Sequence, residues 1–420
     1  DYHLYKAIPD HRRLWDAQLG EVSQRASWLF GPPNESKPSG EEPLLISEFG
    51  NWGLPNAEQM IEKEGKEPWW FESGSEWEEG TVYPHGVFKR FRTWGMDKVF
   101  TSVQALFEAT QWHQYRALKY QIESMRCRPE IAGYVVTQLT DVYWECNGLF
   151  DLYRNPKAYT HRLATINTDL LVIPRWERVA YWSGESIEIP LVIASGIHPP
   201  FEHAEIHWRL EPSDLKGSSI GFELDTYQVR EIGKVAFVAP QVTTPSLYTL
   251  TLELRSSDGH LLSANDLALV VFPRQRKIIN PWKRLWTSDE HLAEYLTALG
   301  YHLSNDPRSA QILVANQLSG MEISYLREGG RLLALLDQPS SLLAEFGVEV
   351  VPREGTPWQG DWATSFSWLR RDRHFADFPG DPLLDYSFDR VIPHCVLLGF
   401  KPLEFEAQVH AGLFVGWIHK

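Results

Sequence analysis

Cysteine is scarce in this sequence, and long apolar runs are missing. Its 420 residues include three cysteines, Cys127, Cys146 and Cys395, which lie far apart without Cys-x-x-Cys spacing. Such spacing predicts neither a disulfide framework nor a zinc site, and we read Cys395 as a core residue. No uninterrupted apolar run approaches the roughly 20 residues of a membrane span, and no signal peptide is recognisable. We therefore expect no metal and no membrane partner, and the compartment stays open.

Positive charge and nucleotide-binding motifs are also lacking. The formal net charge is −15, whereas nucleic-acid affinity comes mainly from basic side chains that neutralise phosphates. Neither a Gly-x-Gly-x-x-Gly nor a Walker sequence is present, so no nucleotide cofactor is expected. His203 and His207 could share one strand face, but no further ligand follows them, and an exposed sheet face is the better interpretation. We predict no cofactor and no nucleic-acid partner.

Aromatic residues, in contrast, are abundant. The chain has 18 tryptophans, and aromatics make up 13% of its residues. Most of them are explained by large apolar cores, but the content also fits a protein whose rings stack on sugar faces.

Hydrophobic patterning divides the chain into three regions. In residues 1–169, a helix follows Pro9, a strand covers Leu44 to Ile46, a long helix runs from about Val99 to Arg126, a buried strand covers residues 131–136, and a last helix starts near Pro156. A long irregular loop is expected between about residues 51 and 97. This alternation is typical of the closing part of an α/β barrel.

The other two regions have different patterns. Residues 170–273 contain short alternating runs such as 186–193, 204–208 and 247–254, which predict an immunoglobulin-like β-sandwich. Residues 274–420 return to alternating helices and strands, with a helix at 289–299, a strand at 310–315 and a strand at 331–336. Glycines end the helices at Gly300 and Gly329, and the outline is doubly wound α/β.

Glu48 is the candidate catalytic residue. It follows the apolar run Leu44-Leu45-Ile46, which suits a strand buried on both faces, and Gly50 then breaks the strand. Barrel enzymes carry their catalytic groups where strands end, so a carboxylate at this point is a candidate nucleophile. On this pattern alone, a glutamate at a strand end is more often solvated or ion-paired.

Three segments resemble the last third of the catalytic barrel of glycoside hydrolase family 2, which includes β-galactosidases, β-glucuronidases and β-mannosidases. They are residues 1–12, 43–55 with Ser47-Glu48-Phe49-Gly50, and 131–156. The resemblance implies the C-terminal part of a (β/α)8 barrel, followed by an Ig-like sandwich. More weakly, it implies a glutamine-amidotransferase-like α/β domain at residues 274–420.

The same resemblance assigns residues to a site. It makes Glu48 the nucleophile of a retaining β-glycosidase, most like a β-galactosidase, and implies substrate contacts by Tyr2, His3, Asn51, Trp52, Gln138, Asp141 and Trp144. Tyr2 and His3 would hold the nucleophile, although both are also consistent with ordinary strand-end polar residues. The chain departs from the family at Thr137, where the family usually has a tryptophan that forms a platform beneath the sugar. Either Trp144 or a tryptophan of the long loop serves as the platform here, or the sugar pocket is wider.

A retaining glycosidase also needs an acid/base carboxyl about 5–5.5 Å from the nucleophile. The family's acid/base residue follows an Asn on an earlier strand, upstream of Asp1, so we expect residues 1–420 alone to be inactive. Glu145 is better explained as a solvated residue or an acceptor for a sugar hydroxyl. The alternative, favoured by Thr137, is a non-catalytic carbohydrate-binding or scaffold protein. The sequence predicts neither the sugar nor the oligomeric state.

Overall fold

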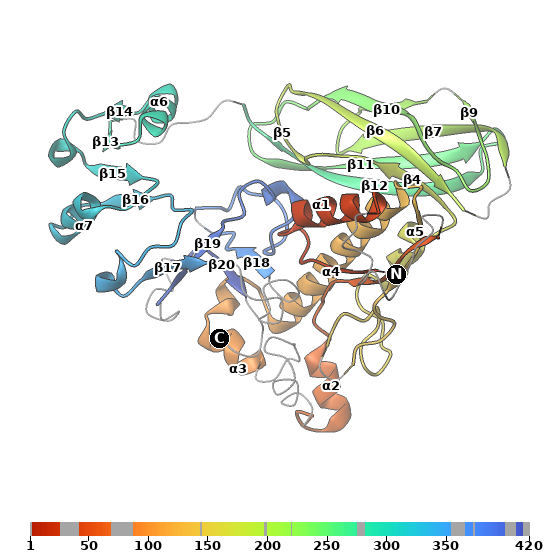
Figure 1. Ribbon diagram of the computed structural model, residues 1–420, viewed down its shortest axis with the longest axis horizontal. Helices are drawn as coiled ribbons and strands as arrows, with labels where there is room; N and C mark the ends of the chain where they lie inside the picture. Colours follow the sequence, from red (N-terminus) through yellow and green to blue (C-terminus); the bar gives the residue numbers. More distant parts are fainter. Residues whose placement is uncertain are drawn as a thin grey trace. The chain divides into compact units, whose positions relative to one another are not determined.

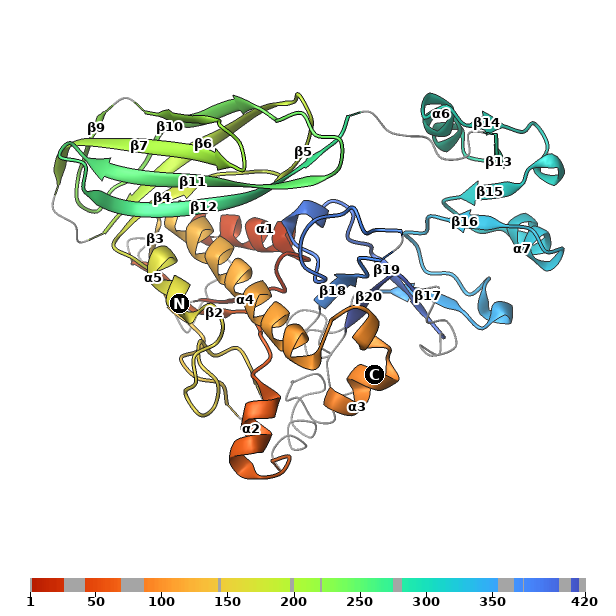
Figure 2. The same ribbon diagram turned by 180° about the vertical axis from the view of Figure 1, so that it is seen from behind.

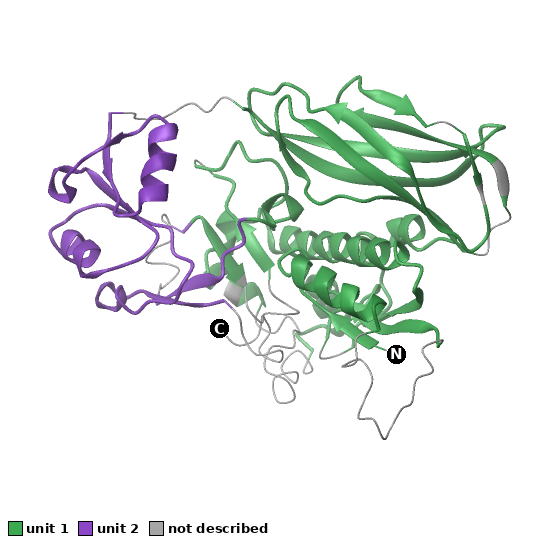
Figure 3. Cartoon of the chain, turned by 45° about the horizontal axis from the view of Figure 1, so that its top comes forward, with its two compact units in different colours: residues 1–274, 356–390, 410–420 green, residues 275–355, 391–409 purple. Residues whose placement is uncertain are grey.

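The structure is a computed structural model that describes residues 2–25, 42–68, 87–142, 145–196, 200–219, 221–274, 282–353, 366–372, 374–399 and 409–414. It is a mixed α/β protein with several sheets. The chain forms two compact units (Figure 3). The first unit contains residues 1–274, 356–390 and 410–420, and the second unit contains residues 275–355 and 391–409. In the described part of the chain, no helix has the length and apolar character needed to cross a membrane.

A three-stranded parallel sheet carries the N-terminal part of the first unit. Its order is β1 (Tyr2–Tyr5), β2 (Leu44–Gly50) and β3 (Ile131–Val136). Helices α1 (Arg12–Ser23) and α4 (Val103–Arg126) run side by side next to it (Figures 1 and 2). The helix predicted after Pro9 is confirmed as α1, and its residues Trp15, Leu19 and Val22 are buried in one core with residues of β1, β2 and α4.

The expectation that these strands are buried on both faces is wrong. Leu45 is 39% exposed and Val135 is 49% exposed, whereas Ile46 is fully buried. The reason is that, among the described residues, the core that contains α1 and α4 packs against the face of this sheet that carries Ile46.

Three predicted boundaries also change. The segment after β2 is not one irregular loop, because it contains helices α2 (Ala57–Glu64) and α3 (Val87–Thr93) and the 3-10 turn η4 (Met96–Lys98). Its residues Trp69, Trp70 and Trp77 lie outside the described residues. Helix α4 begins at Val103, because the Ser102 side chain accepts a hydrogen bond from the Ala105 amide and caps it. The last helix begins only at η5 (Thr160–Arg162) and α5 (Leu163–Ile166), since Pro156 pairs with Phe150 in an isolated bridge.

Two sheets pack face to face in the next region. The first has β4 (Leu170–Pro174), β6 (Ser186–Ser195) and β10 (Val229–Val238). The second has β5 (Ala180–Trp182), β12 (Leu261–Phe272), β11 (Ser246–Ser256), β7 (Phe201–Glu211) and β8 (Lys216–Ser218), and β9 (Phe222–Leu224) pairs with β7. Alternate residues of both sheets form a common core, and Figure 2 shows the sheets from behind. The predicted strands at 186–193, 204–208 and 247–254 are confirmed.

The second unit contains a four-stranded parallel sheet in the order β14 (His302–Leu303), β13 (Arg284–Trp286), β15 (Ile312–Ala315) and β16 (Leu332–Ala334). Helices α6 (Glu290–Ala298) and α7 (Gly320–Arg327) and the turns η6 (Pro307–Ser309) and η7 (Ala344–Phe346) connect or follow these strands. Gly300 and Gly329 have φ of 87° and 84°, as helix-ending glycines require. Strand β17 (Glu349–Pro352) pairs with β19 (Cys395–Leu398), where Cys395 is buried as expected.

A C-terminal segment belongs to the first unit. It contains β18 (Phe366–Leu369), the turn η8 (Tyr386–Phe388) and β20 (Ala411–Phe414). The Arg12 guanidinium of α1 forms an ion pair with Asp389 at 2.5 Å and lies 4.9 Å from the ring of Trp176. Tyr386 packs against Trp176 and Tyr120. Arg12 therefore joins α1, the start of the two-sheet region and the C-terminal segment.

We predict that Arg12→Met destabilises the first unit by about 3–5 kcal/mol, because it leaves the buried Asp389 carboxylate without its partner. Arg13→Met is the matched control: Arg13 is exposed on the same helix, and its loss should change stability by less than about 0.5 kcal/mol. Urea unfolding of both variants measures the difference, and equal stabilities would contradict the assigned role of Arg12.

A second prediction concerns His113 of α4, which is buried with its ring edge-on to Phe366. Among the described residues, neither of its ring nitrogens has a hydrogen-bond partner. Burial lowers the pKa of His113 to about 4, and Arg116 adds to this while Asp10 and Asp385 oppose it. As the pH falls from about 6.5 to 4, the unfolded chain binds a proton that the folded protein does not, so stability is lost in this window.

His113→Leu should therefore flatten the decline of unfolding free energy between pH 6.5 and 4 by on the order of 3 kcal/mol. Unfolding measured across this pH range tests it, with the exposed His260→Leu as the control that keeps the wild-type slope. Parallel curves for wild type and His113→Leu would rule out this role.

Candidate functional site

A one-residue irregularity in β2 determines where Glu48 points. Along β1, Tyr2 pairs with Ile46, but its neighbour His3 pairs with Glu48. Along β3, Tyr134 pairs with Ile46 and Val136 pairs with Phe49. Between Ile46 and Phe49, strand β2 thus uses one residue more than β1 or β3, as a β-bulge does. Ile46 and Phe49 are both buried in the core, although residues three apart in a regular strand lie on opposite faces. Glu48 therefore does not lie on the core face.

The Glu48 carboxylate is held from one side. The Tyr5 hydroxyl donates a hydrogen bond to Oε2 at 3.1 Å, and His3 Nδ1 lies 3.2 Å from the same oxygen. The Glu48 side chain remains 42% exposed, and no described residue donates a hydrogen bond to Oε1. Burial raises the pKa of Tyr5, and the adjacent charge of Glu48 adds to the rise, so Tyr5 stays a protonated donor at neutral pH.

The ends of β2 and β3 approach each other closely beside this carboxylate. The Thr137 amide donates to Phe49 O at 2.8 Å, and the peptide bond between Thr137 and Gln138 is cis. A hydrogen bond with the Thr137 side chain lowers the pKa of Tyr5, against the effects of burial and of Glu48. Thr137, Tyr5 and Glu48 therefore form one connected set.

The loop after β2 is buried. The Asn51 side chain donates to Lys6 O at 3.1 Å and to Gly50 O at 2.7 Å, and it accepts from the Ile8 amide at 3.3 Å. The Trp52 ring is buried and lies 5.8 Å from the Tyr5 ring. These contacts order the backbone next to Glu48, and sugar contacts by Asn51 and Trp52 stay predictions.

The loop after β3 contains the other predicted residues. Gln138 donates to Asn147 Oδ1 at 3.1 Å. Asp141 is buried, and its Oδ1 accepts from Lys157 Nζ at 3.0 Å and from the Gly148 amide at 2.8 Å. Burial raises the pKa of Asp141 to about 7, while Lys157 and Gly148 work in the opposite direction. Substrate binding by Gln138 and Asp141 stays a prediction, and Trp144 lies outside the described residues.

The structure brings two of the predicted residues, Glu48 and His3, into contact, and it adds Tyr5. Tyr2 packs against the core that contains Leu4 and Ile46, on the other face of β1, so its predicted substrate contact also stays untested. The sequence analysis did not predict Tyr5 as a site residue. Residues two apart in a strand share a face, so the position of Tyr5 two residues after His3 could have indicated it.

Gln114 and Lys157 are two further residues near the site that the prediction did not include. Gln114 lies between Thr110 and Ala117 on the buried stripe of α4, and an amide on an apolar stripe is a signal that a polar partner is buried with it. Lys157 has no comparable signal, because it follows Pro156 in an irregular segment.

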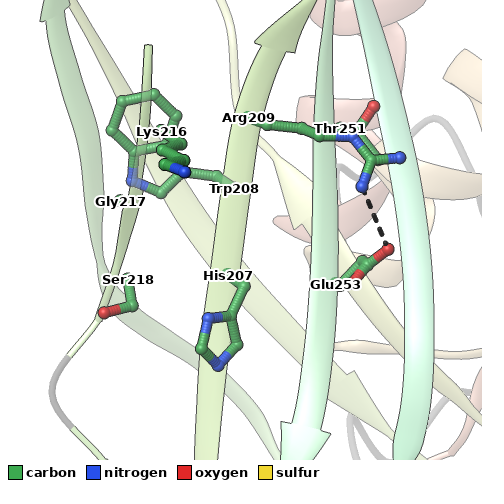
Figure 4. A pocket seen from close by; sticks show the side chains of 8 residues that line it. All are labelled: His207, Trp208, Arg209, Lys216, Gly217, Ser218, Thr251 and Glu253. Atoms are coloured by element: carbon green, nitrogen blue, oxygen red, sulfur yellow. Dashed lines mark ion pairs between the residues drawn. The ribbon is translucent and has the colours of Figure 1, made fainter. Parts of the chain in front are cut away.

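The structure also contains a cavity of about 380 Å³ on β7, β8 and β11 (Figure 4). Trp208 packs against Gly217 there, and Arg209 lies 3.6 Å from Glu253, which also pairs with Arg255. The cavity includes none of the predicted site residues. In the described ranges, no group of three or more His, Cys, Asp or Glu side chains is arranged to hold a metal ion.

We predict that Gly50→Ala disrupts the site. A Cβ at position 50 would lie 2.3 Å from Thr137 O, so β2 and β3 must separate, at a cost of about 1–3 kcal/mol. Gly20→Ala in α1, where nothing lies within 4 Å of the added carbon, should instead stabilise by about 0.5–1 kcal/mol. Thermal unfolding compares the two, and equal melting temperatures would refute the close approach at Gly50.

Comparison with known proteins gives distant structural matches only. No family model and no curated protein matches the chain. The exo-chitosanase CsxA of Amycolatopsis orientalis matches this chain with 13% sequence identity and a TM-score of 0.37. The match covers 56% of this chain and 28% of that enzyme. A complex of a CsxA variant with PNP-beta-D-glucosamine gives the same values. Spo0M, a sporulation control protein of Bacillus subtilis, has 12% identity and a TM-score of 0.20, over 31% of this chain and 56% of Spo0M. These values amount to a distant structural resemblance to a glycoside hydrolase, too remote to support an argument about activity.

Proposed function

We propose that the protein is a retaining β-glycosidase of the family 2 type, most like a β-galactosidase, with Glu48 as nucleophile. One observation carries the proposal: a half-exposed carboxylate at the end of a parallel strand is held through a single oxygen by Tyr5 and His3. The C-terminal ends of parallel strands are where barrel enzymes place catalytic groups. In this proposal β1, β2 and β3 are the closing strands of a (β/α)8 barrel and residues 170–273 are Ig-like. The doubly wound α/β domain that was expected at residues 274–420 is the second unit, residues 275–355 and 391–409.

The contacts of Glu48 suit covalent catalysis. Oε1 attacks the anomeric carbon while the bond to the leaving oxygen breaks, and that oxygen takes a proton from the acid/base carboxyl. Water then attacks the glycosyl ester, gives its proton back to the same carboxyl and releases the Glu48 carboxylate. The Tyr5 hydrogen bond and the His3 imidazole at Oε2 fix the orientation of the Glu48 carboxylate.

The acid/base group is the second requirement. The family resemblance places it N-terminal to Asp1, after an Asn, so we expect residues 1–420 alone to leave unactivated glycosides intact. Glu145 lies close enough to Tyr5 to raise its pKa. We assign Glu145 a contact with a sugar hydroxyl and no proton transfer, because its loop differs from the strand end on which the family carries the acid.

Sugar contacts in this proposal come from the loops after β2 and β3. Trp52 and Gln138 lie next to Tyr5 and Asn147, respectively. Thr137 contacts Tyr5, at the position where the family usually has a tryptophan platform. In this proposal either the smaller side chain widens the pocket above Glu48, or Trp144 or a tryptophan of the long loop replaces the platform.

Thr137 also supports a second candidate, a carbohydrate-binding or scaffold protein without catalysis. Both candidates bind a sugar, but only the glycosidase forms a covalent bond through Glu48. The two are separated by testing for that bond.

We predict that the full-length protein reacts with activated 2-deoxy-2-fluoro-β-glycosides that carry a dinitrophenolate leaving group, which departs without a proton from the acid. Galactoside, glucoside, mannoside and glucuronide reagents are compared by mass spectrometry of the intact protein and of its peptides. One sugar should add to the peptide that contains Glu48, and the reagent that reacts fastest identifies the sugar.

Three variants sharpen this test. Glu48→Gln should abolish labelling, and Tyr5→Phe should slow it about tenfold, because a charge-assisted hydrogen bond is lost. Glu58→Gln, an exposed glutamate on α2, is the control and should label like the wild type. Reversible binding of the sugars without any adduct would support the scaffold protein, and an adduct on another residue would refute Glu48 as nucleophile.

A further inference from the structure

The side chain of Lys157 is almost completely buried behind the site. It is 1% exposed, and its ammonium group is surrounded by oxygen atoms. Nζ donates to Gly53 O at 2.8 Å, to Asp141 Oδ1 at 3.0 Å and to Cys146 O at 3.1 Å, and Gln114 Oε1 lies at 3.3 Å. One cation thus contacts the loop after β2, the loop after β3 and helix α4.

Gln114 extends this contact. Its Nε2 donates to Asn51 O at 2.7 Å, to Asn147 O at 2.9 Å and to Gly148 O at 3.2 Å. The packing leaves no space for a side chain at Gly53, where a Cβ would lie 2.6 Å from Gln114 Oε1. Lys157 and Gln114 together fix the backbone of both loops to the same helix.

Each loop carries a residue to which the proposed function gives a sugar contact. Trp52 lies between Asn51 and Gly53, the two residues whose carbonyl groups Gln114 and Lys157 hold. Gln138 donates to Asn147, whose carbonyl group Gln114 also holds. Glu48 is held separately, by Tyr5 and His3 of β1.

We propose that Lys157 is a positioning residue that sets the distance between the Trp52 and Gln138 walls of the sugar site without acting on Glu48. The proposal rests on the glycosidase function given above. Apolar residues in place of both Lys157 and Asp141 could fill the same space at similar stability. Only a group with three donors, however, can bind the carbonyl oxygens of two loops and a carboxylate at once.

This role predicts a separation of kinetic constants. With the fluoro-glycoside that labels Glu48, Lys157→Met should raise the concentration for half-maximal inactivation about tenfold and leave the limiting rate constant within about twofold, because the walls shift while Glu48 stays in place. Tyr5→Phe should show the converse, a slower limiting rate with little change in half-maximal concentration.

A double variant distinguishes positioning from stability alone. Lys157→Met leaves Asp141 buried without its partner and should lower the melting temperature. Lys157→Met combined with Asp141→Asn removes both charges and keeps an acceptor for the Gly148 amide, so it should recover much of the melting temperature. The half-maximal concentration should remain raised. Its return to the wild-type value would show that the pair serves only stability and would overturn the proposal.

Hydrogen exchange gives a readout that does not depend on labelling. The Gly53 amide donates to Cys146 O at 3.1 Å, across the two loops. In the double variant, peptides containing Gly53 and Gly148 should exchange at least tenfold faster than in the wild type, while the β2 peptide around Ile46 keeps its rate. If wild type is not labelled, the proposed function fails, and the exchange rates still decide whether Lys157 positions the loops; unchanged rates at Gly53 and Gly148 would overturn that role.

Discussion

The extra residue in β2 is the constraint on which the candidate site depends. In a regular strand Glu48 would share a face with Ile46, which is buried against the helices. A carboxylate on that face would be desolvated among apolar side chains. The bulge between Ile46 and Phe49 instead keeps both apolar residues in the core and directs Glu48 toward His3 and Tyr5. The same local change thus keeps the apolar side chains buried and leaves the Glu48 carboxylate partly exposed.

The surroundings of Glu48 differ strongly in polarity and exposure. The carboxylate itself is half exposed and contacts two side chains of one strand, whereas the loops that flank it are fixed by buried amide and ammonium groups. Asn51 binds three backbone groups of the loops after β1 and β2, and Lys157 binds the loops after β2 and β3. Buried polar groups of this kind are costly unless each finds a partner, so they restrict the loops to one arrangement. An exposed carboxylate between restricted loops is the arrangement that the proposed function requires, because such a site must admit a substrate and hold it in one orientation.

Much of the fold could be predicted from local sequence, for physical reasons that differ between elements. The apolar stripe of α1 and α4 has helical spacing, and Gly300 and Gly329 adopt the positive φ that ends a helix, so these elements follow from the residues themselves. The strands of the two-sheet region alternate because their two faces meet different environments. Burial on both faces of β2 could not be judged from its leucines, because it depends on how many layers cover the sheet. Nor could the contact of Arg12 with Asp389, which joins residues 377 positions apart.

For the candidate site, the sequence alone determined that a carboxylate follows an apolar strand and precedes a glycine-rich turn, and the family resemblance brought His3 to it. Only the tertiary structure decided which face Glu48 occupies, that Tyr5 contacts both Glu48 and Thr137, and that Asp141 faces a buried lysine. The physical reason is that side-chain direction in a strand follows from local alternation only while the strand is regular. A bulge is defined by the register of the neighbouring strands, and the partner of a buried charge is defined by packing between segments distant in sequence.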